Sequence, residues 1–407
     1  MSLRALGARS AILSFLPALI VFIAFWPIAR PVEGVGDTFQ FWYAGHLVAT
    51  GGSAYDQQAW HAAGAAYGAV AANVAANCAD PLGVICVWTY PPLTAWLFAP
   101  FGALPVTAGL LAVNVFVLVT LIAGVVAAAL FFGPRDPSPR ALVLAAAAAS
   151  HPFVIDIRAG HFVGLLLLAL VAAAYGLRER RAWPIAAGAI ALALKPHVAI
   201  VVALAVPAAL ASRRAWWTIA SIVGALALVT AVALLRSPEA VGAIVSRGGA
   251  KAGIAWSTTW ALADATGAPV IALAACGIVA FGAATLAVRS APADRRDLTI
   301  VAVAAALSLV VTPYAQPYDF LLALPAFAAA AAAASAIRPP ARTALLAVIA
   351  LCIVVGTWSP IVFGQLSRAV APGYAAVPIA ALVLLAVALR AGRQATAPQP
   401  ATVTAPA

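Results

Sequence analysis

A polar stretch near the start of the chain reads EGVGDTFQFWY from Glu33 to Tyr43, directly after a first apolar run. It opens a long polar insert that ends in WTYPPL (88–93), where the chain returns to apolar sequence. Asp37 lies at the beginning of this insert, just beyond an apolar segment of about the length that a bilayer requires. A carboxylate in an aromatic-rich loop beside a membrane span indicates chemistry at a membrane surface.

The composition places the whole chain in a membrane. Of its 407 residues, 65% are hydrophobic and 9% are charged, and the mean hydropathy is +1.04. Soluble domains carry far more charge, and a β-barrel would show short alternating segments in place of these continuous Ala, Leu and Val runs. The sequence therefore predicts an all-α polytopic membrane protein.

Twelve apolar segments are expected to cross the bilayer. They are 11–29, 105–132, 141–157, 161–177, 183–194, 197–211, 215–235, 268–288, 298–312, 319–337, 343–358 and 374–390. Residues 1–393 are predicted to form one integral-membrane domain, and 394–407 a disordered cytoplasmic tail. Within the domain, 30–104 is a large first outward loop, with amphipathic helices at 37–50 and 56–77 and a short re-entrant helix at 93–101.

The charged residues set the expected orientation. The net charge of +11 is spread over short clusters between spans, which argues against a nucleic-acid partner because no basic stripe lies along one face. With the amino terminus in the cytoplasm, most Lys and Arg residues fall in cytoplasmic segments and most acidic residues fall outside, as the positive-inside rule expects. Both termini are therefore predicted to be cytoplasmic, and the Asp37 insert faces out.

The four cysteines divide into two kinds. Cys276 and Cys352 lie within predicted spans and are expected to be inert packing residues. Cys78 and Cys86 share the outward insert, where they form either a disulfide or two free thiols.

Three polar turns interrupt the apolar segments on the same outward side as Asp37. Lys195-Pro196 separates two segments that are short for a bilayer, so this junction is expected to lie below the outer surface, next to a cavity. Similar turns occur at 156–161 and 312–319. Ionisable groups at membrane depth are costly and are usually functional, so these turns are predicted to form one site with Asp37.

The residue types in this predicted site suit displacement of a phosphate leaving group by a hydroxyl. A carboxylate takes the hydroxyl proton and cations neutralise charge on the phosphate, while aromatic faces suit sugar rings and isoprenoid chains. The candidate catalytic base is Asp37, and the candidate substrate-binding residues are Lys195, Arg158, His161, His197, Tyr90, Tyr314, Tyr318, Asp319 and Trp42. No metal-ligand spacing stands out, and neither a metal nor a cofactor is expected.

Each of these residues also has a structural interpretation. Asp37 or Asp319 could cap the helix that it begins, and Lys195 could extend its ammonium toward the interface. Arg158 could pair with Asp156 or a lipid headgroup, and Tyr90 could be an interfacial aromatic residue. Their coincidence on one side of the membrane favours function.

The motifs in these segments resemble glycosyltransferase family 87 of the membrane-embedded GT-C glycosyltransferases. The resemblance covers roughly residues 10–390 and rests on motifs in order along the chain: Gly36-Asp37, FWYAG (41–45), GSAYD (52–56), YPPL (90–93), Leu104-Pro105, GHF (160–162), ALKPH (193–197), TPY (312–314) and Tyr318-Asp319. The chain differs from the family pattern in having His161-Phe162 and His197 where Gln or Asn is usual. Tyr318-Asp319 stands where mannosyltransferases often have a histidine.

The resemblance implies a GT-C-like helical bundle, a polyprenyl-phosphate sugar donor, and an aspartate in the first outward loop as the base, a position that Asp37 occupies. The leading hypothesis is a bacterial inner-membrane hexosyltransferase of inverting type, with mannose as the expected sugar and a lipid or envelope glycan as acceptor at the periplasmic face. The partners are then the donor, the acceptor and membrane lipids. Two alternatives stay open at this point: a transporter or flippase of a lipid-linked or anionic substrate, and a non-catalytic envelope assembly subunit.

Overall fold

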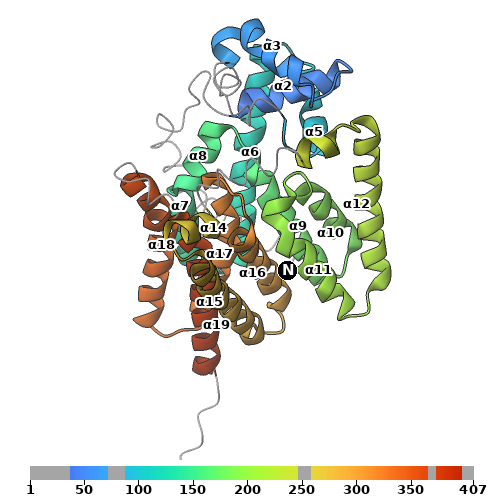
Figure 1. The fold of residues 1–407 in the computed structure, drawn as a ribbon. Helices are drawn as coiled ribbons and strands as arrows, with labels where there is room; N and C mark the ends of the chain where they lie inside the picture. The colour runs from blue at the N-terminus through green and yellow to red at the C-terminus, as the bar shows by residue number, and fades with distance from the viewer. Residues whose placement is uncertain (1–36, 72–87, 246–257, 365–372, 397–407) are drawn as a thin grey trace, which may run out of the picture.

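The computed structural model describes residues 37–71, 88–245, 258–364 and 373–396, and these parts are helical with no β-strand (Figure 1). In chain order the elements are α2 (Thr38–Ala49), α3 (Gln57–Tyr67), the 3₁₀ helix η2 (Gly68–Ala71), α5 (Pro92–Gly102), α6 (Val106–Phe132), α7 (Pro137–Ala148), α8 (His151–Ala159), α9 (Val163–Glu179), α10 (Ala182–Leu192), η3 (Pro196–Ala199), α11 (Ile200–Ala211), α12 (Trp216–Arg236), α14 (Thr259–Ala265), α15 (Pro269–Ser290), α16 (Arg296–Val311), η4 (Pro317–Ala323), α17 (Leu324–Ala334), α18 (Ala341–Gly364) and α19 (Ala376–Thr396). The all-α prediction is confirmed for these residues.

Several helices are long and apolar enough to cross a membrane. Among the described residues there are six such spans, or seven when α7 and α8, which meet at a 49° bend, count as one. A helix or helix pair lies at every predicted span that the structure describes, but α9, α10, α11 and α16 are shorter than a full crossing. The predicted total of twelve spans is therefore not confirmed, and the first predicted span (11–29) and the pair Cys78 and Cys86 lie outside the described residues.

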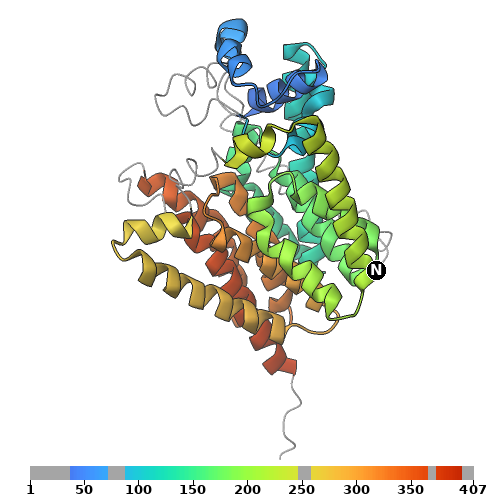
Figure 2. The ribbon, with the colours of Figure 1, turned by 45° about the vertical axis from the view of Figure 1, so that its right-hand side comes forward.

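The polar insert forms a cap of short helices at one end of the bundle, where α2 and α3 lie together above the longer helices (Figures 1 and 2). Helix α2 packs on α5 and on α6, and α5 also contacts α12. Helices were predicted at 37–50 and 93–101, and α2 and α5 lie there; α3 ends before 77, at Tyr67. Asp56 begins α3 by accepting hydrogen bonds from the backbone N–H groups of Gln58 and Ala59, a standard N-cap.

The breaks between helices lie where the sequence places Gly and Pro. Gly160 ends α8 in the left-handed region, with φ +69°, which glycine adopts without a steric cost. Pro196 begins η3 after Lys195, and Pro317 begins η4, each at a position where a missing backbone N–H costs nothing. These breaks turn the backbone just where the polar residues occur. At the other end of the chain, α19 continues to Thr396, slightly beyond the expected start of the tail at 394.

Basic residues gather at the end of the bundle opposite the cap. Arg213 pairs with Asp297 and donates to the Leu177 carbonyl, and Arg342 pairs with Asp136. The loops after α6, α9, α11, α15 and α17 therefore meet at one end, as the predicted topology requires. The 156–161, 194–196 and 312–319 breaks lie at the other end, next to the cap.

Candidate active site

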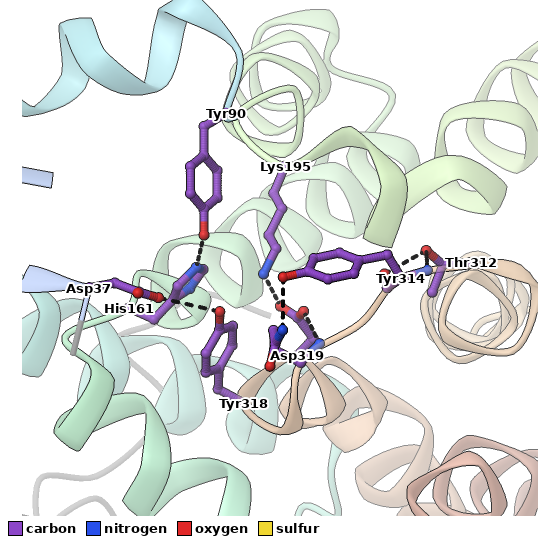
Figure 3. A network of polar contacts seen from close by, with 9 residues as sticks. Asp37, Tyr90, His161, Lys195, Thr312, Tyr314, Tyr318 and Asp319 are labelled. Atoms are coloured by element: carbon purple, nitrogen blue, oxygen red, sulfur yellow. Dashed lines mark hydrogen bonds and ion pairs between the residues drawn. The ribbon is translucent and has the colours of Figure 1, made fainter. Parts of the chain in front are cut away.

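Four helix breaks meet beneath the cap and enclose a network of polar side chains (Figure 3). Tyr90 precedes α5, Lys195 precedes η3, and Tyr318 and Asp319 lie on η4. His161 lies in the turn between α8 and α9. These residues are far apart in sequence, and the packing of α8 and α16 on η4 brings their segments together.

A buried ion pair lies at the centre of the network. Nζ of Lys195 donates to Oδ1 of Asp319 at 2.6 Å, with the two side chains 1% and 0% exposed. Oδ2 of Asp319 accepts the backbone N–H of Gln316 at 2.9 Å. Asp319 thus also bonds to the backbone at the start of its own helix, as the alternative interpretation expected. Desolvating two charges offsets much of their attraction, so stability alone does not explain this pair.

Tyr318 joins this pair to Asp37. Nζ of Lys195 lies 4.6 Å from the Tyr318 ring centroid, within the range of a cation–π contact. The hydroxyl of the same tyrosine donates to Oδ2 of Asp37 at 3.5 Å. Asp37 and Lys195 therefore belong to one connected network.

Asp37 is at the N-cap position of α2, but its side chain makes no capping hydrogen bond. Its backbone N–H instead donates to the Ala159 carbonyl at 2.5 Å, which ties the start of α2 to the end of α8. The approach is close, because a Cβ on Gly160 would lie 1.8 Å from Oγ1 of Thr38. This close packing of α2 on the end of α8 orients the Asp37 carboxylate toward Tyr318 (Figure 3). The capping interpretation of Asp37 is therefore wrong.

His161 is held between two tyrosines. Its ring stacks on Tyr318 with centroids 4.0 Å apart, and its Nε2 lies 2.9 Å from the Tyr90 hydroxyl. Burial, followed by the negative charge of Asp37, raises the pKa of Tyr90 well above its usual value, so Tyr90 stays a neutral phenol that can donate a proton in a hydrogen bond. Tyr55 fixes this arrangement by donating to the Tyr90 carbonyl at 2.7 Å.

Tyr314 and His197 lie at the rim of the network, with ring centroids 5.5 Å apart. The Tyr314 hydroxyl accepts from Nε2 of Gln316 at 2.8 Å, and burial raises the pKa of Tyr314 to about 12. Both side chains are half-buried, as are Asp37 and Tyr90, whereas Lys195, Tyr318 and Asp319 are buried.

The comparison with known families covers this network only in part. A sequence model of glycosyltransferase family 87 matches residues 88–313, more than half of the chain. This chain belongs to glycosyltransferase family 87. No curated protein and no solved structure matches it.

The resemblance inferred from the motifs is thereby confirmed, and the protein is a glycosyltransferase by family. The matched region of this family 87 protein includes Tyr90, His161 and Lys195, and it ends before Tyr318 and Asp319. Asp37 precedes it. The two carboxylates that the network joins thus lie on either side of the region that defines the family.

Sequence reasoning missed Asp156 as a member of the site. Asp156 is fully buried on α8, and it lies close enough to Asp37, Lys195 and Asp319 for their charges to interact. Neither of its carboxylate oxygens has a hydrogen-bond partner within the described residues. Asp156 lies close to the helix break at Gly160, and His161 follows the same break. This proximity could have identified Asp156 from the sequence.

Two predicted substrate-binding residues are not brought into the network. Arg158 is half-buried and makes no hydrogen bond or ion pair with any described residue. Its expected alternative pairing with Asp156 is absent, because residues two apart on a helix face different directions. Trp42 is buried, stacks on His46 with centroids 5.1 Å apart, and packs against Gly109 of α6.

The described residues contain no group of three or more His, Cys, Asp or Glu side chains placed to hold a metal ion. Lys195 and Asp319 are instead paired with each other, and Asp37 accepts from Tyr318. What this arrangement offers chemically is a carboxylate beside a tyrosine hydroxyl, a cation fixed 4.6 Å from a tyrosine ring, and phenols that can donate to oxygen atoms.

Proposed function

We propose that this family 87 protein transfers a hexose, with mannose as the first sugar to test, from a polyprenyl phosphate to a hydroxyl of a lipid or envelope glycan. The reaction takes place at the periplasmic face of a bacterial inner membrane. Asp37 is the base, and Lys195 stabilises the phosphate that leaves. The single observation that carries the proposal is the connection from Asp37 through Tyr318 to the buried Lys195–Asp319 pair.

Asp37 suits the role of base because its side chain is not used to cap α2. The residue is half-buried, so part of it remains exposed to an acceptor hydroxyl. Tyr318 holds one of its oxygens. A carboxylate oriented in this way can take a proton as the hydroxyl attacks.

Lys195 suits the phosphate because its position is fixed and its donors are not exhausted. An ammonium group has three N–H donors, and one of them bonds Asp319. A fixed cation in a dry site stabilises charge on a leaving group more strongly than the same cation in water. Asp319 and Tyr318 thus act on the phosphate indirectly, by holding Lys195 in place.

An apolar cavity beside Lys195 supports a lipid-linked donor. It has a volume of about 190 Å³ and lies between α9, α10, α11 and α12, with Leu192, Pro196, Val202 and Ile222 in its wall. Pro196, the residue after Lys195 in the chain, lies in the wall of this cavity, whereas Lys195 itself does not. The apolar lining suits an isoprenoid chain whose phosphate is bound near the helix break at 195–196.

The proposed step balances as a single displacement. The acceptor oxygen attacks the anomeric carbon, its proton passes to Asp37, and the bond from that carbon to the phosphate oxygen breaks. Polyprenyl phosphate leaves with the electron pair. Attack opposite the leaving group inverts the anomeric centre, so a β-linked donor gives an α-linked product.

The experiment that tests this proposal supplies membranes containing the protein with a polyprenyl phosphate that carries a radiolabelled hexose. Label appearing in a new glycoconjugate is the expected result, and Asp37→Asn should lower its rate of appearance roughly a hundredfold or more. Movement of the labelled lipid across the membrane without a new glycoconjugate would instead show a transporter. Undiminished transfer by a folded Asp37→Asn variant would show that Asp37 is not the base.

A further inference from the structure

Two neighbouring loops at the basic end of the bundle carry arginines and exposed tryptophans together. One loop, at 179–182, joins α9 to α10, and the other, at 212–215, joins α11 to α12. Arg213 links them by donating to the Leu177 carbonyl at 3.1 Å. Helix α12 packs on both α10 and α11. The two loops therefore form one surface, about a helix length away from the candidate active site.

Most of the positive charge on this surface has no partner among the residues that the structure describes. Arg178 pairs with Glu179, and Arg213 with Asp297. The exposed side chains of Arg180, Arg181 and Arg214 make no hydrogen bond or ion pair with the described residues. Three cations thus remain available to an anionic ligand.

The backbone at two of these arginines is unusual. Arg180 has φ +56° and Arg214 has φ +57°, and among the described residues these are the two non-glycine residues with positive φ. Side chains other than Gly, Asn and Asp adopt this region at a cost. Glycine would remove the strain but also the charge, so the strain is consistent with a requirement for arginine.

Three tryptophans flank the arginines. Trp183 lies in the first turn of α10, and Trp216 and Trp217 begin α12, with exposed fractions of 68%, 61% and 89%. Tryptophan is enriched at the level of lipid headgroups, where its ring is apolar and its N–H is polar. Farther toward the bilayer core, Leu204 on α11 and Leu228 on α12 are exposed apolar residues.

We infer that this surface binds the headgroups of anionic phospholipids in the leaflet at the basic end of the bundle. Arg180, Arg181 and Arg214 contact the phosphates, and the tryptophan rings lie between the headgroups. Each arginine near such a surface strengthens attraction to anionic lipid. Because α12 has few buried residues and lines the apolar cavity, lipid bound here would hold α12 in position beside that cavity.

The test uses the full-length protein in bilayers of equal amounts of phosphatidylcholine and phosphatidylglycerol. After mild delipidation, native mass spectrometry measures the ratio of the two lipids that stay bound. The variant Arg180→Asn/Arg181→Gln/Arg214→Asn removes the three charges, and Asn tolerates the left-handed backbone. A matched control, Arg289→Gln/Arg296→Gln/Arg338→Gln, removes three exposed arginines from other loops at the same end.

The wild type and the control should retain phosphatidylglycerol in preference, and the loop variant should lose this preference roughly tenfold. An equal loss in both variants would show a general charge effect and overturn the inference, as would an unchanged preference in the loop variant. If the triple variant does not fold, the single variant Arg181→Gln replaces it in the same measurement, because Arg181 has an ordinary backbone conformation. The single variant should lose the preference for phosphatidylglycerol roughly threefold. None of these outcomes depends on sugar transfer.

Discussion

Lys195 and Asp319 pair inside the end of the bundle that carries the cap, whereas Arg342 and Asp136 pair on the surface at the opposite end. The first two side chains are 1% and 0% exposed, and the second two are 28% and 46% exposed. A buried pair is costly when one partner is lost, while an exposed pair contributes little to stability. A basic residue paired with an aspartate thus has very different consequences for stability at the two ends.

The aspartates that begin helices differ in the same way. Asp136 at the basic end and Asp56 in the cap each accept a hydrogen bond from the first turn of their helix. Asp37 occupies the same position at α2 but bonds Tyr318 instead. The carboxylates of Asp136 and Asp56, which cap helices, are therefore distinguishable from that of Asp37, which does not.

The largest effect is expected from Lys195→Met. The change leaves Asp319 buried without its cation, which should lower the free energy of unfolding by about 3–5 kcal/mol and abolish sugar transfer. Thermal melting of the detergent-solubilised protein measures the first effect, and the radiolabel assay measures the second.

The double variant Lys195→Met/Asp319→Leu separates the two roles of the pair. It removes both charges, so thermal stability should recover toward that of the wild type, while transfer should remain absent. Recovery of transfer together with stability would show that the pair is purely structural.

Asp37→Asn is expected to have the next largest effect. Loss of a general base should lower the rate of transfer roughly a hundredfold or more, with little change in melting temperature because the Asp37 side chain does not cap α2. The matched control is Asp56→Asn, which keeps a good N-cap residue at α3 and should leave transfer unchanged. Equal losses of transfer in the two variants would contradict the distinction between these aspartates.

Much of this contrast could be predicted from the sequence, because it depends on local signals. Gly160, Pro196 and Pro317 mark the helix breaks, and the sidedness of charge places Asp37 and Lys195 at one end. The partners within the site could not be predicted in this way. Asp319 is 124 residues from Lys195, and their pairing follows from how α16 and η4 pack, which hydropathy does not encode.

Two residues that were predicted to bind substrate, Trp42 and Arg158, lie outside the network. Trp42 shares α2 with Asp37, but it is turned onto Gly109 of α6, and only the tertiary packing decides which aromatic faces the site. Asp156 and Arg158 are two residues apart on α8, so helix geometry already placed them on different faces. The structure directs Asp156 toward the network and leaves Arg158 outside it.

Gly160→Ala tests how precisely Asp37 must be placed. The new Cβ would lie 1.8 Å from Oγ1 of Thr38, so α2 must shift away from α8 and carry Asp37 with it. Transfer should fall roughly tenfold, because small displacements of a reacting group are costly. Gly51→Ala is the control: its φ is +83° but nothing lies within 4 Å, so it should reduce stability without reducing transfer. Equal transfer by the two variants would contradict this placement.

The smallest effect is expected from Arg342→Gln at the basic end. Asp136 loses its partner but remains exposed to solvent and still accepts from Ser138, so the free energy of unfolding should change by at most about 1 kcal/mol. Melting temperature and transfer are measured beside those of Lys195→Met. High salt should reduce the difference between Arg342→Gln and the wild type further, since exposed pairs are screened, whereas the loss in Lys195→Met should persist in salt because its site is buried. If salt affected both variants alike, the two ends would not differ in the way that their burial indicates.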